Sequence, residues 1–135
     1  MPKEKKVQEN SIRVLLVDDE KEYVKVLSNR LTLRNIDVTK TYSGSEALQV
    51  LRKQDFDVAV LDIKMEDMDG LELLKILKKM APQIEVIMLT GHGSAEESKQ
   101  GMKLGAYNYL IKPCEFEDLL DKIKGAYQKS HLLKL

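Results

Sequence analysis

The chain has 135 residues, of which 43% are hydrophobic, and this size suits one domain with a single buried core. Lysine and arginine together number 22, as do aspartate and glutamate, so no net charge draws the protein toward nucleic acid or a membrane surface. The single cysteine, Cys114, excludes an internal disulfide and a cysteine-based zinc site. No apolar run approaches the roughly 20 residues of a membrane span, so we expect a cytoplasmic protein.

The chain begins with a polar tail, a strand and a helix. Residues 1–11 have no apolar core, which predicts a disordered tail and not a signal peptide. Ile12 to Val17 is a β-branched apolar run typical of a strand that is buried on both faces. From Glu20 the apolar spacing becomes helical. The residues expected on the core face of this helix are Tyr23, Val24, Leu27 and Leu31.

Two further strands flank a capped helix. Residues 36–42 and 57–61 are short runs with the composition of strands. Between them, Ser43 and Glu46 have the spacing of a capping box, which predicts the start of a helix that runs through Leu51. Strand and helix therefore continue to alternate through the middle of the chain.

The same alternation extends through the next helix and strand. Residues 70–80 have helical apolar spacing, and Pro82 ends this helix. Residues 84–89 form the fourth predicted strand. The core-facing residues of the helix are expected to be Leu73, Ile76, Leu77 and Met80.

A second capping box, Ser94 with Glu97, predicts a helix that has few apolar residues. This helix also contains Gly101, so we expect it to be the least firmly held. Its apolar residues are chiefly Ala95, Met102 and Leu104.

The last strand and helix complete the pattern. Residues 106–111 predict a fifth strand, and the final helix begins near Glu115. Residues 131–135 are expected to be the end of this helix or the start of a linker. The core positions of the helix are expected to be Phe116, Leu119, Leu120, Ile123 and Tyr127.

Five predicted strands thus alternate with five predicted helices through short connections. This order predicts an α/β fold, a single doubly wound (βα)5 domain over residues 12–130. Its parallel five-stranded sheet is covered on both faces, with right-handed crossovers. In such a sheet, ligands bind beyond the carboxyl ends of the strands. We therefore expect the functional residues at that edge.

Polar residues follow four of the five predicted strands. They are Asp18 and Asp19, then Asp62, Thr90 and Lys112. Each alone is an ordinary turn residue, but a parallel sheet brings them to one edge. Three close carboxylates require more positive charge than one lysine supplies. Carboxylates without a nearby His or Cys suit Mg²⁺, and Mg²⁺ with a lysine and a hydroxyl group suits a phosphoryl group.

Four segments carry a more specific pattern: VDDE (17–20), LDIKM with MDG (61–70), LTG (89–91) and GAYNYLIKP (105–113). In this combination they resemble the receiver domain of two-component response regulators, over Ile12 to Gly125. The resemblance implies a flavodoxin-like sheet in the order 2-1-3-4-5. It also implies a phospho-acceptor switch that is not a turnover enzyme but catalyses its own phosphotransfer and dephosphorylation.

The resemblance assigns a metal site to the acids. The Asp62 carboxylate would accept the phosphoryl group and, with Asp19, would bind Mg²⁺, or Mn²⁺ in its place, directly. Asp18 would bind the cation through water. The backbone carbonyl group of Lys64 would complete the protein ligands.

The resemblance also assigns groups to the phosphoryl oxygens and to the switch. Lys112 and Thr90 would contact phosphoryl oxygens, and Tyr109 would turn inward behind Thr90. His92 would lie near the phosphoryl group, where it would tune dephosphorylation. We do not expect His92 to bind a metal.

The implied partners lie on both sides of the switch. A sensor histidine kinase or a phosphotransfer protein would supply the phosphoryl group from a phosphohistidine. The face formed by the fourth helix, fifth strand and fifth helix would control a downstream protein or output domain, and is a candidate homodimer surface. We expect no direct contact with nucleic acid and no membrane association.

The chain departs from the pattern of this family at three positions. Glu66 stands where proline is usual, Gly91 where alanine is common, and Asn108 where aspartate is frequent. Glu66 should loosen the loop after Asp62 and add negative charge near the metal. We therefore expect it to alter cation affinity or phosphoryl lifetime. The neighbouring Asp67 and Asp69 are interpreted as solvated loop and turn residues.

Three alternatives stand beside this interpretation. The first is a receiver-like interaction module that phosphorylation does not regulate. The second is a phosphatase with an aspartate nucleophile, but such enzymes need a second acid two residues later, where this chain has Lys64. The third is a flavodoxin-like cofactor binder, but the acids of residues 18–22 would repel a phosphate group.

Overall fold

The computed structural model describes residues 11–91 and 95–132, which form one five-stranded sheet and five helices. The strands are β1 (Arg13–Val17), β2 (Asp37–Thr41), β3 (Val58–Asp62), β4 (Glu85–Thr90) and β5 (Asn108–Ile111). The helices are α1 (Lys21–Leu33), α2 (Gly44–Leu51), α3 (Gly70–Met80), α4 (Ala95–Lys103) and α5 (Phe116–Leu132). All strand pairs are parallel, in the order β2-β1-β3-β4-β5. The predicted fold class and the strand order implied by the family resemblance are confirmed.

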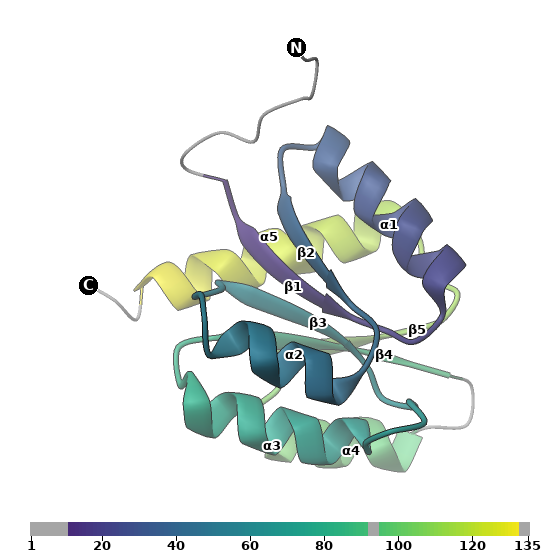
Figure 1. Ribbon diagram of the computed structural model, residues 1–135, viewed down its shortest axis with the longest axis vertical. Coiled ribbons are helices and arrows are strands. Elements are labelled where there is room, and N and C mark those ends of the chain that lie inside the picture. Colours follow the sequence, from purple (N-terminus) through teal and green to yellow (C-terminus); the bar gives the residue numbers. More distant parts are fainter. Residues whose placement is uncertain (1–10, 92–94, 133–135) are drawn as a thin grey trace.

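The sheet is covered by helices on both faces. Helices α1 and α5 lie on one face, and α2, α3 and α4 lie on the other (Figure 1). Successive side chains of a strand point to opposite faces, so in β1 Leu16 packs with α1 and α5 while Leu15 packs with α2 and α3. Every residue of β3 and β4 is buried. In the described part of the chain, no helix is both long and apolar enough to cross a membrane.

The start of α2 follows from local sequence. The Ser43 hydroxyl group accepts a hydrogen bond from the Glu46 amide at 3.1 Å. In return the Glu46 carboxylate accepts one from the Tyr42 amide at 2.9 Å. The predicted capping residue is therefore correct, although the reciprocal bond reaches the residue before the cap. Ser94 of the other predicted capping box lies outside the described residues.

The core face of α3 differs from the predicted one. Met80 is 42% exposed and Ile76 is only partly buried. Their places in the core are taken by Leu71 and Leu74, beside Leu73 and Leu77, which were predicted correctly. Because α3 packs between α2 and α4 as well as against β3, its buried stripe lies closer to the start of the helix.

Helix α4 packs chiefly through small residues, and of the apolar residues predicted to hold it only Leu104, just after the helix, packs against the core. Ala95 and Met102 are exposed, whereas Ser98 and Gly101 are buried. A side chain at position 101 would collide with the Met88 side chain of β4. The close approach of α4 to the sheet therefore depends on residues without large side chains. This leaves the larger Met102 outside the core.

Two tyrosines that were predicted as core residues are only partly buried. Tyr23 on α1 and Tyr127 on α5 pack against the core cluster at its margin. The fully buried position next to Tyr127 is Ala126. Each tyrosine thus contributes only part of its ring to the core.

At Gly70, the first residue of α3, the start of the helix lies directly against the backbone of Ile63. An added Cβ atom there would lie 2.6 Å from the carbonyl oxygen of Ile63, and the Gly70 amide donates a hydrogen bond to the same oxygen at 2.9 Å. Backbone cannot rotate aside as a side chain does. We therefore expect Gly70→Ala to lower the free energy of unfolding by about 1 to 3 kcal/mol, measured by urea denaturation.

Gly91→Ala is the matched control, because an added Cβ atom at Gly91 meets no described atom within 4 Å. We expect its stability to be close to that of the wild type. If both variants lost the same stability, close packing at Gly70 would not be the cause.

Candidate functional site

The predicted polar residues converge at the carboxyl edge of the sheet. Asp62 is the last residue of β3 and Thr90 is the last residue of β4, while Asp18 follows β1 and Lys112 follows β5. Parallel register aligns these strand ends, with Asp62 opposite Leu89 and Thr90 opposite Ile111. Asp18, Asp62 and Thr90 are all buried.

Lys112 makes the central polar contacts of this edge. Its ammonium nitrogen lies 2.7 Å from a Glu20 carboxylate oxygen and 3.0 Å from one of Asp18. The nearest Asp62 oxygen is 3.8 Å away, which is within ion-pair distance but too far for a hydrogen bond. The same nitrogen lies 4.6 Å from the centre of the Tyr23 ring. Lys112 is thus enclosed by three acids and an aromatic ring.

The Lys112 ammonium group stays charged in this setting. Burial lowers its pKa, but the hydrogen bonds to Glu20 and Asp18 and the charges of Asp18 and Asp62 outweigh burial and raise the pKa above its ordinary value. The lysine therefore supplies a permanent positive charge to the site.

The turn after β1 fixes Asp18 by its backbone and its side chain. The Asp18 amide donates to the Thr41 carbonyl group at 3.2 Å. Its carboxylate accepts from the Glu20 amide at 2.9 Å. Neither Asp18 nor Asp19 caps α1, because the N-cap residue is Glu20 and its side chain makes no capping hydrogen bond.

The surroundings of Asp62 disfavour the ionised form of its carboxyl group. Burial, with the nearby charges of Asp18 and Asp19, raises its pKa to about 6. Lys112 and a 3.2 Å hydrogen bond from the Lys64 amide lower the pKa, but they compensate only in part. A cation bound at this edge would stabilise the ionised form of the carboxyl group.

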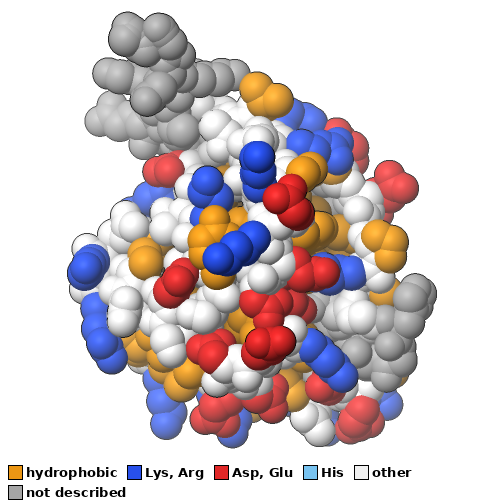
Figure 2. Space-filling view, turned by 45° about the vertical axis from the view of Figure 1, so that its right-hand side comes forward, with side chains coloured by type: hydrophobic (Ala, Val, Ile, Leu, Met, Phe, Trp, Pro, Cys, Tyr) orange, Lys and Arg blue, Asp and Glu red, His pale blue; other side chains and the backbone are white. Residues whose placement is uncertain are grey.

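Asp62 also faces an open depression of about 480 Å³. Figure 2 shows acidic side chains gathered on this side of the molecule. The depression is lined by Asp19, Glu20, Asp62, Lys64, Glu66, Gly91 and Lys112. The depression is open, so the Asp62 side chain can be reached from solvent there.

The acids form a donor set that fits a divalent cation. Among the described residues, one carboxylate oxygen from each of Asp18, Glu20 and Asp62 lies within 4.8 Å of the others. Hard carboxylate oxygens of this kind suit Mg²⁺ or Mn²⁺. Glu20 was not predicted from the sequence as a site residue, and its only signal was its place as the last acid of VDDE.

The structure shows the surroundings of the other predicted metal-site residues, but it does not test whether they bind a metal. The Asp19 carboxylate accepts a hydrogen bond from the Glu66 amide at 3.3 Å, and Glu66 lines the depression. Direct metal binding by Asp19 and by the Lys64 carbonyl group stays a prediction. The effect of Glu66 on cation affinity also stays a prediction.

The proposed switch residues lie on β4 and β5. The Thr90 hydroxyl group is buried and lies 3.5 Å from the Leu110 carbonyl group. Tyr109, on the edge strand β5, is 39% exposed, so its side chain lies largely at the surface. The inward position of Tyr109 stays a prediction. His92 lies outside the described residues.

The acids after Asp62 are structural, not merely solvated. Asp67 accepts hydrogen bonds from the amides of Gly44 and Ser45 at the start of α2, at 3.1 and 3.2 Å. The Gly44 bond is the main cause that lowers the pKa of Asp67. Asp69 caps α3 through the Leu71 amide at 2.9 Å. Asp67 is thus an exposed loop residue, as interpreted, and in addition it binds the start of α2.

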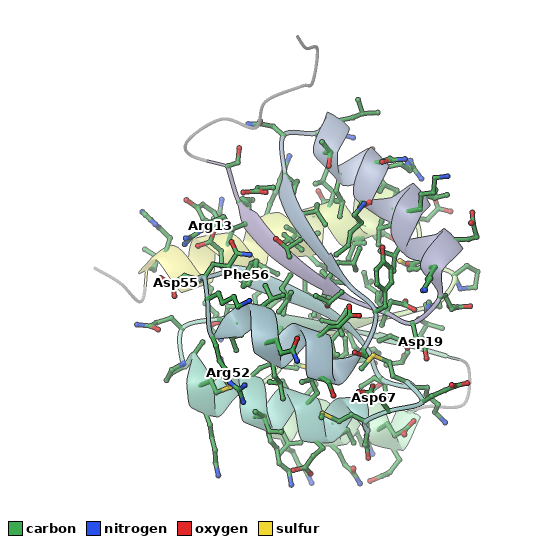
Figure 3. The ribbon with its side chains drawn as sticks, in the orientation of Figure 1. Arg13, Asp19, Arg52, Asp55, Phe56 and Asp67 are labelled. Atoms are coloured by element: carbon green, nitrogen blue, oxygen red, sulfur yellow. The ribbon has the colours of Figure 1, made fainter. Side chains whose placement is uncertain are left out.

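The hydrogen bonds of Asp67 attach the loop after Asp62 to the start of α2. Figure 3 shows Asp67 and Asp19 at the same end of the sheet, whereas Arg13 and Asp55 lie at the opposite end. The loop is thus held to α2 by Asp67 and to the turn after β1 by the Glu66 amide. These two contacts restrict the loop without closing the depression.

Cys114 lies close to this site, and its setting disfavours the thiolate form of the side chain. Burial is the largest cause that raises the pKa of its thiol group, although a hydrogen bond with Tyr23 opposes the shift. A raised pKa leaves little thiolate, the nucleophilic form of cysteine. The thiol group therefore contributes packing beside Tyr23.

The fold and the site together define a class: an α/β domain with a buried carboxylate beside a charged lysine at the carboxyl edge of its sheet. The chain belongs to the response regulator receiver domain family, whose model matches residues 14–124. The transcriptional regulatory protein ZraR of Escherichia coli K12 is 34% identical over 122 residues, which are 90% of this chain and 28% of that protein. The chain thus spans little more than a quarter of that regulator.

Solved structures show the same relationship. A response regulator receiver domain protein from Clostridium thermocellum superposes with a TM-score of 0.87 at 32% identity, covering 90% of this chain and 98% of that chain. A CheY-like receiver domain protein from Methanospirillum hungatei gives a TM-score of 0.86 at 33% identity, with the same coverage. The chain is therefore homologous to receiver domains of two-component response regulators.

The raised pKa of Asp62 has a consequence for stability. Its folded-state value of about 6 exceeds the ordinary value of 3.8, so between these values the folded protein binds more protons than the unfolded chain. By linkage, ionised Asp62 reduces stability fully above about pH 6 and not at all below about pH 4. Without divalent cations, we expect Asp62→Asn to raise the free energy of unfolding by about 1 to 3 kcal/mol at pH 7.5.

The gain should shrink toward zero near pH 4, as measured by urea denaturation in the presence of a chelator. Asp121→Asn, an exposed acid on α5, is the control and should change stability little at either pH. Equal stability of Asp62→Asn and the wild type at pH 7.5 would contradict the electrostatic cost at Asp62.

Proposed function

We propose that the chain is the phospho-acceptor switch of a two-component phosphorelay and that Asp62 is the phosphorylated residue. One observation carries this proposal: a buried carboxylate at the end of β3 faces an open depression beside Lys112 and two further acids. The donor would be the phosphohistidine of a sensor histidine kinase or of a phosphotransfer protein. The single Cys114 suits action in a reducing cytoplasm.

The transfer itself is a displacement at phosphorus. An Asp62 carboxylate oxygen attacks, the phosphorus–nitrogen bond of the donor breaks, and its electron pair leaves with the imidazole ring. With a pKa of about 6, Asp62 is mostly ionised at neutral pH and needs no general base. Catalysis is therefore chiefly positioning and charge neutralisation.

The surrounding residues neutralise the phosphoryl oxygens. Lys112 contributes its ammonium group, and the Thr90 hydroxyl group reaches a second oxygen. Asp19 and Asp62 would hold Mg²⁺ or Mn²⁺ directly, Asp18 through water, and Lys64 through its carbonyl group. When bound, the cation offsets the charge of the acids and of the phosphoryl group. The acyl phosphate is later hydrolysed at the same site, so the domain acts once per phosphorylation and is not a turnover enzyme.

The output surface would be the face of α4, β5 and α5. Thr90 moves toward the phosphoryl group, and Tyr109, which is at the surface in this structure, turns inward behind it. Helix α4 buries only Ser98 and Gly101 among its residues, so a small change at β4 can shift it. The partner would be a downstream protein, an output domain or a second copy of this chain.

A direct test is incubation with Mg²⁺ and acetyl phosphate, followed by intact-mass measurement. We expect the wild type to gain one phosphoryl group that hydroxylamine removes, as it removes acyl phosphates. Asp62→Asn should gain none, whereas Asp67→Asn should still be phosphorylated because Asp67 binds the start of α2. An adduct on Asp62→Asn, or none on the wild type with any donor or kinase, would refute the proposal.

Glu66 offers a second test, on the metal. Its carboxylate lines the depression and its amide donates to Asp19. Removing one exposed charge near the site should weaken Mg²⁺ binding by about two- to fivefold at low salt. We expect this loss in Glu66→Gln, which keeps the backbone amide donor. We expect a larger loss in Glu66→Pro, which also removes the hydrogen bond that positions the Asp19 carboxylate.

Both affinities can be measured by isothermal titration calorimetry at low and high salt. The loss in Glu66→Gln should diminish at high salt, because the charge is exposed. Unchanged Mg²⁺ affinity and phosphoryl lifetime in both variants would show that Glu66 does not tune this site.

A further inference from the structure

The closest partner of Lys112 is not the proposed acceptor but Glu20. The ammonium nitrogen lies 2.7 Å from Glu20 and 3.8 Å from Asp62. An ammonium group has three donor hydrogens, and two of them are directed to Glu20 and Asp18. The side of the ammonium group near Tyr23 is covered by the ring.

We propose that Glu20 is a positioning residue for Lys112. In the unphosphorylated protein it holds the ammonium group away from Asp62, and it releases this group when a phosphoryl group arrives. The inference rests on the proposed function in one respect, because it takes Asp62 as the phosphorylated residue.

The burial of the two carboxylate partners shows which one can exchange. The Asp18 side chain is completely buried, whereas that of Glu20 is 63% exposed. The backbone of Glu20 is fixed, since its amide donates to Asp18 and its carbonyl group accepts from Val24 at 3.0 Å. Only the Glu20 side chain is free to swing into solvent, where water replaces its contact with the lysine.

The exchange is balanced for the lysine. Lys112 gives up one charge-assisted hydrogen bond to a carboxylate and gains one to a phosphoryl oxygen, and its bond to Asp18 persists. Without Glu20, the ammonium group no longer has to leave a partner before it can neutralise the phosphoryl oxygens. Glu20 therefore gives the lysine a defined resting position, and it slows phosphorylation because this contact must first break.

A competing role for Glu20 gives opposite results. Its carboxylate belongs to the acidic group within 4.8 Å of Asp18 and Asp62, so it is also placed to bind a cation. A metal ligand, when removed, should weaken Mg²⁺ binding and slow phosphorylation. A residue that restrains Lys112 should leave Mg²⁺ affinity nearly unchanged and speed phosphorylation when it is removed.

Three variants distinguish the effect of the contact between Glu20 and Lys112 from the effect of the Glu20 charge. Glu20→Gln removes the charge, and Glu20→Asp keeps the charge but shortens the side chain, so that it no longer reaches Lys112. Glu22→Gln is the matched control, since Glu22 lies two residues away, is exposed, and makes no ion pair within the described residues. Phosphorylation by acetyl phosphate with Mg²⁺ is followed by intact mass at several donor concentrations.

At saturating donor we expect Glu20→Gln and Glu20→Asp to be phosphorylated about three to five times faster than the wild type, the scale of one partly exposed ion pair. Glu22→Gln should match the wild type. A charge effect on donor binding alone would change the half-saturating concentration in Glu20→Gln and Glu22→Gln alike. Equal rates in all four proteins, or a tenfold loss of Mg²⁺ affinity in Glu20→Gln by calorimetry, would overturn the proposal.

The contact itself has a readout that does not depend on phosphorylation. In ¹⁵N-lysine NMR spectra without divalent cations, the Lys112 ammonium protons should exchange faster with water in Glu20→Gln and Glu20→Asp than in the wild type and Glu22→Gln. Unchanged exchange would overturn the inference. Failure of the wild type to accept a phosphoryl group would refute only the proposed function, because this signal tests Glu20 separately.

Discussion

The site depends on one ammonium group among carboxylates. Because helices cover both faces of the sheet, its carboxyl edge is where several strands can present polar groups together. Asp18, Glu20 and Asp62 are brought within a few ångströms of one another there, an arrangement that like charges oppose. Lys112 contacts all three. The pKa of Asp62 is raised chiefly by burial and then by the charges of Asp18 and Asp19, and Lys112 compensates for these effects only in part.

This electrostatic cost suits the acceptor role proposed for Asp62. A fully neutralised carboxylate would gain little from a cation or from the positive groups that accompany a donor, whereas Asp62 would be stabilised by each. The surrounding structure resists relaxation, since every residue of β3 and β4 is buried and Asp18 is bound at its amide and its carboxylate. The fold thus holds the acids together against their repulsion, as preorganised electrostatic sites require.

The sequence predicted the features that depend on local pattern. Alternation of strands and helices predicted the fold, and the ends of the strands located Asp18, Asp62, Thr90 and Lys112, because parallel strands end at one edge. Contacts that depend on the direction of a side chain were not predictable. Glu20 reaches Lys112 across 92 residues, and Asp67 reaches the start of α2 across 23 residues. No pattern along the chain distinguishes these acids from solvated ones.

The packing of α4 was mispredicted for a related reason, and the cause links the site to the proposed output face. From its hydrophobicity, Met102 was predicted to hold α4 to the core. The helix instead lies so close to the sheet that a residue without a side chain, Gly101, contacts the Met88 side chain. Met88 and Thr90 are two residues apart on β4, so their side chains point to the same face of the sheet. In the proposed switch, a movement of Thr90 toward a phosphoryl group would therefore act on the stretch of strand that carries the contact of α4.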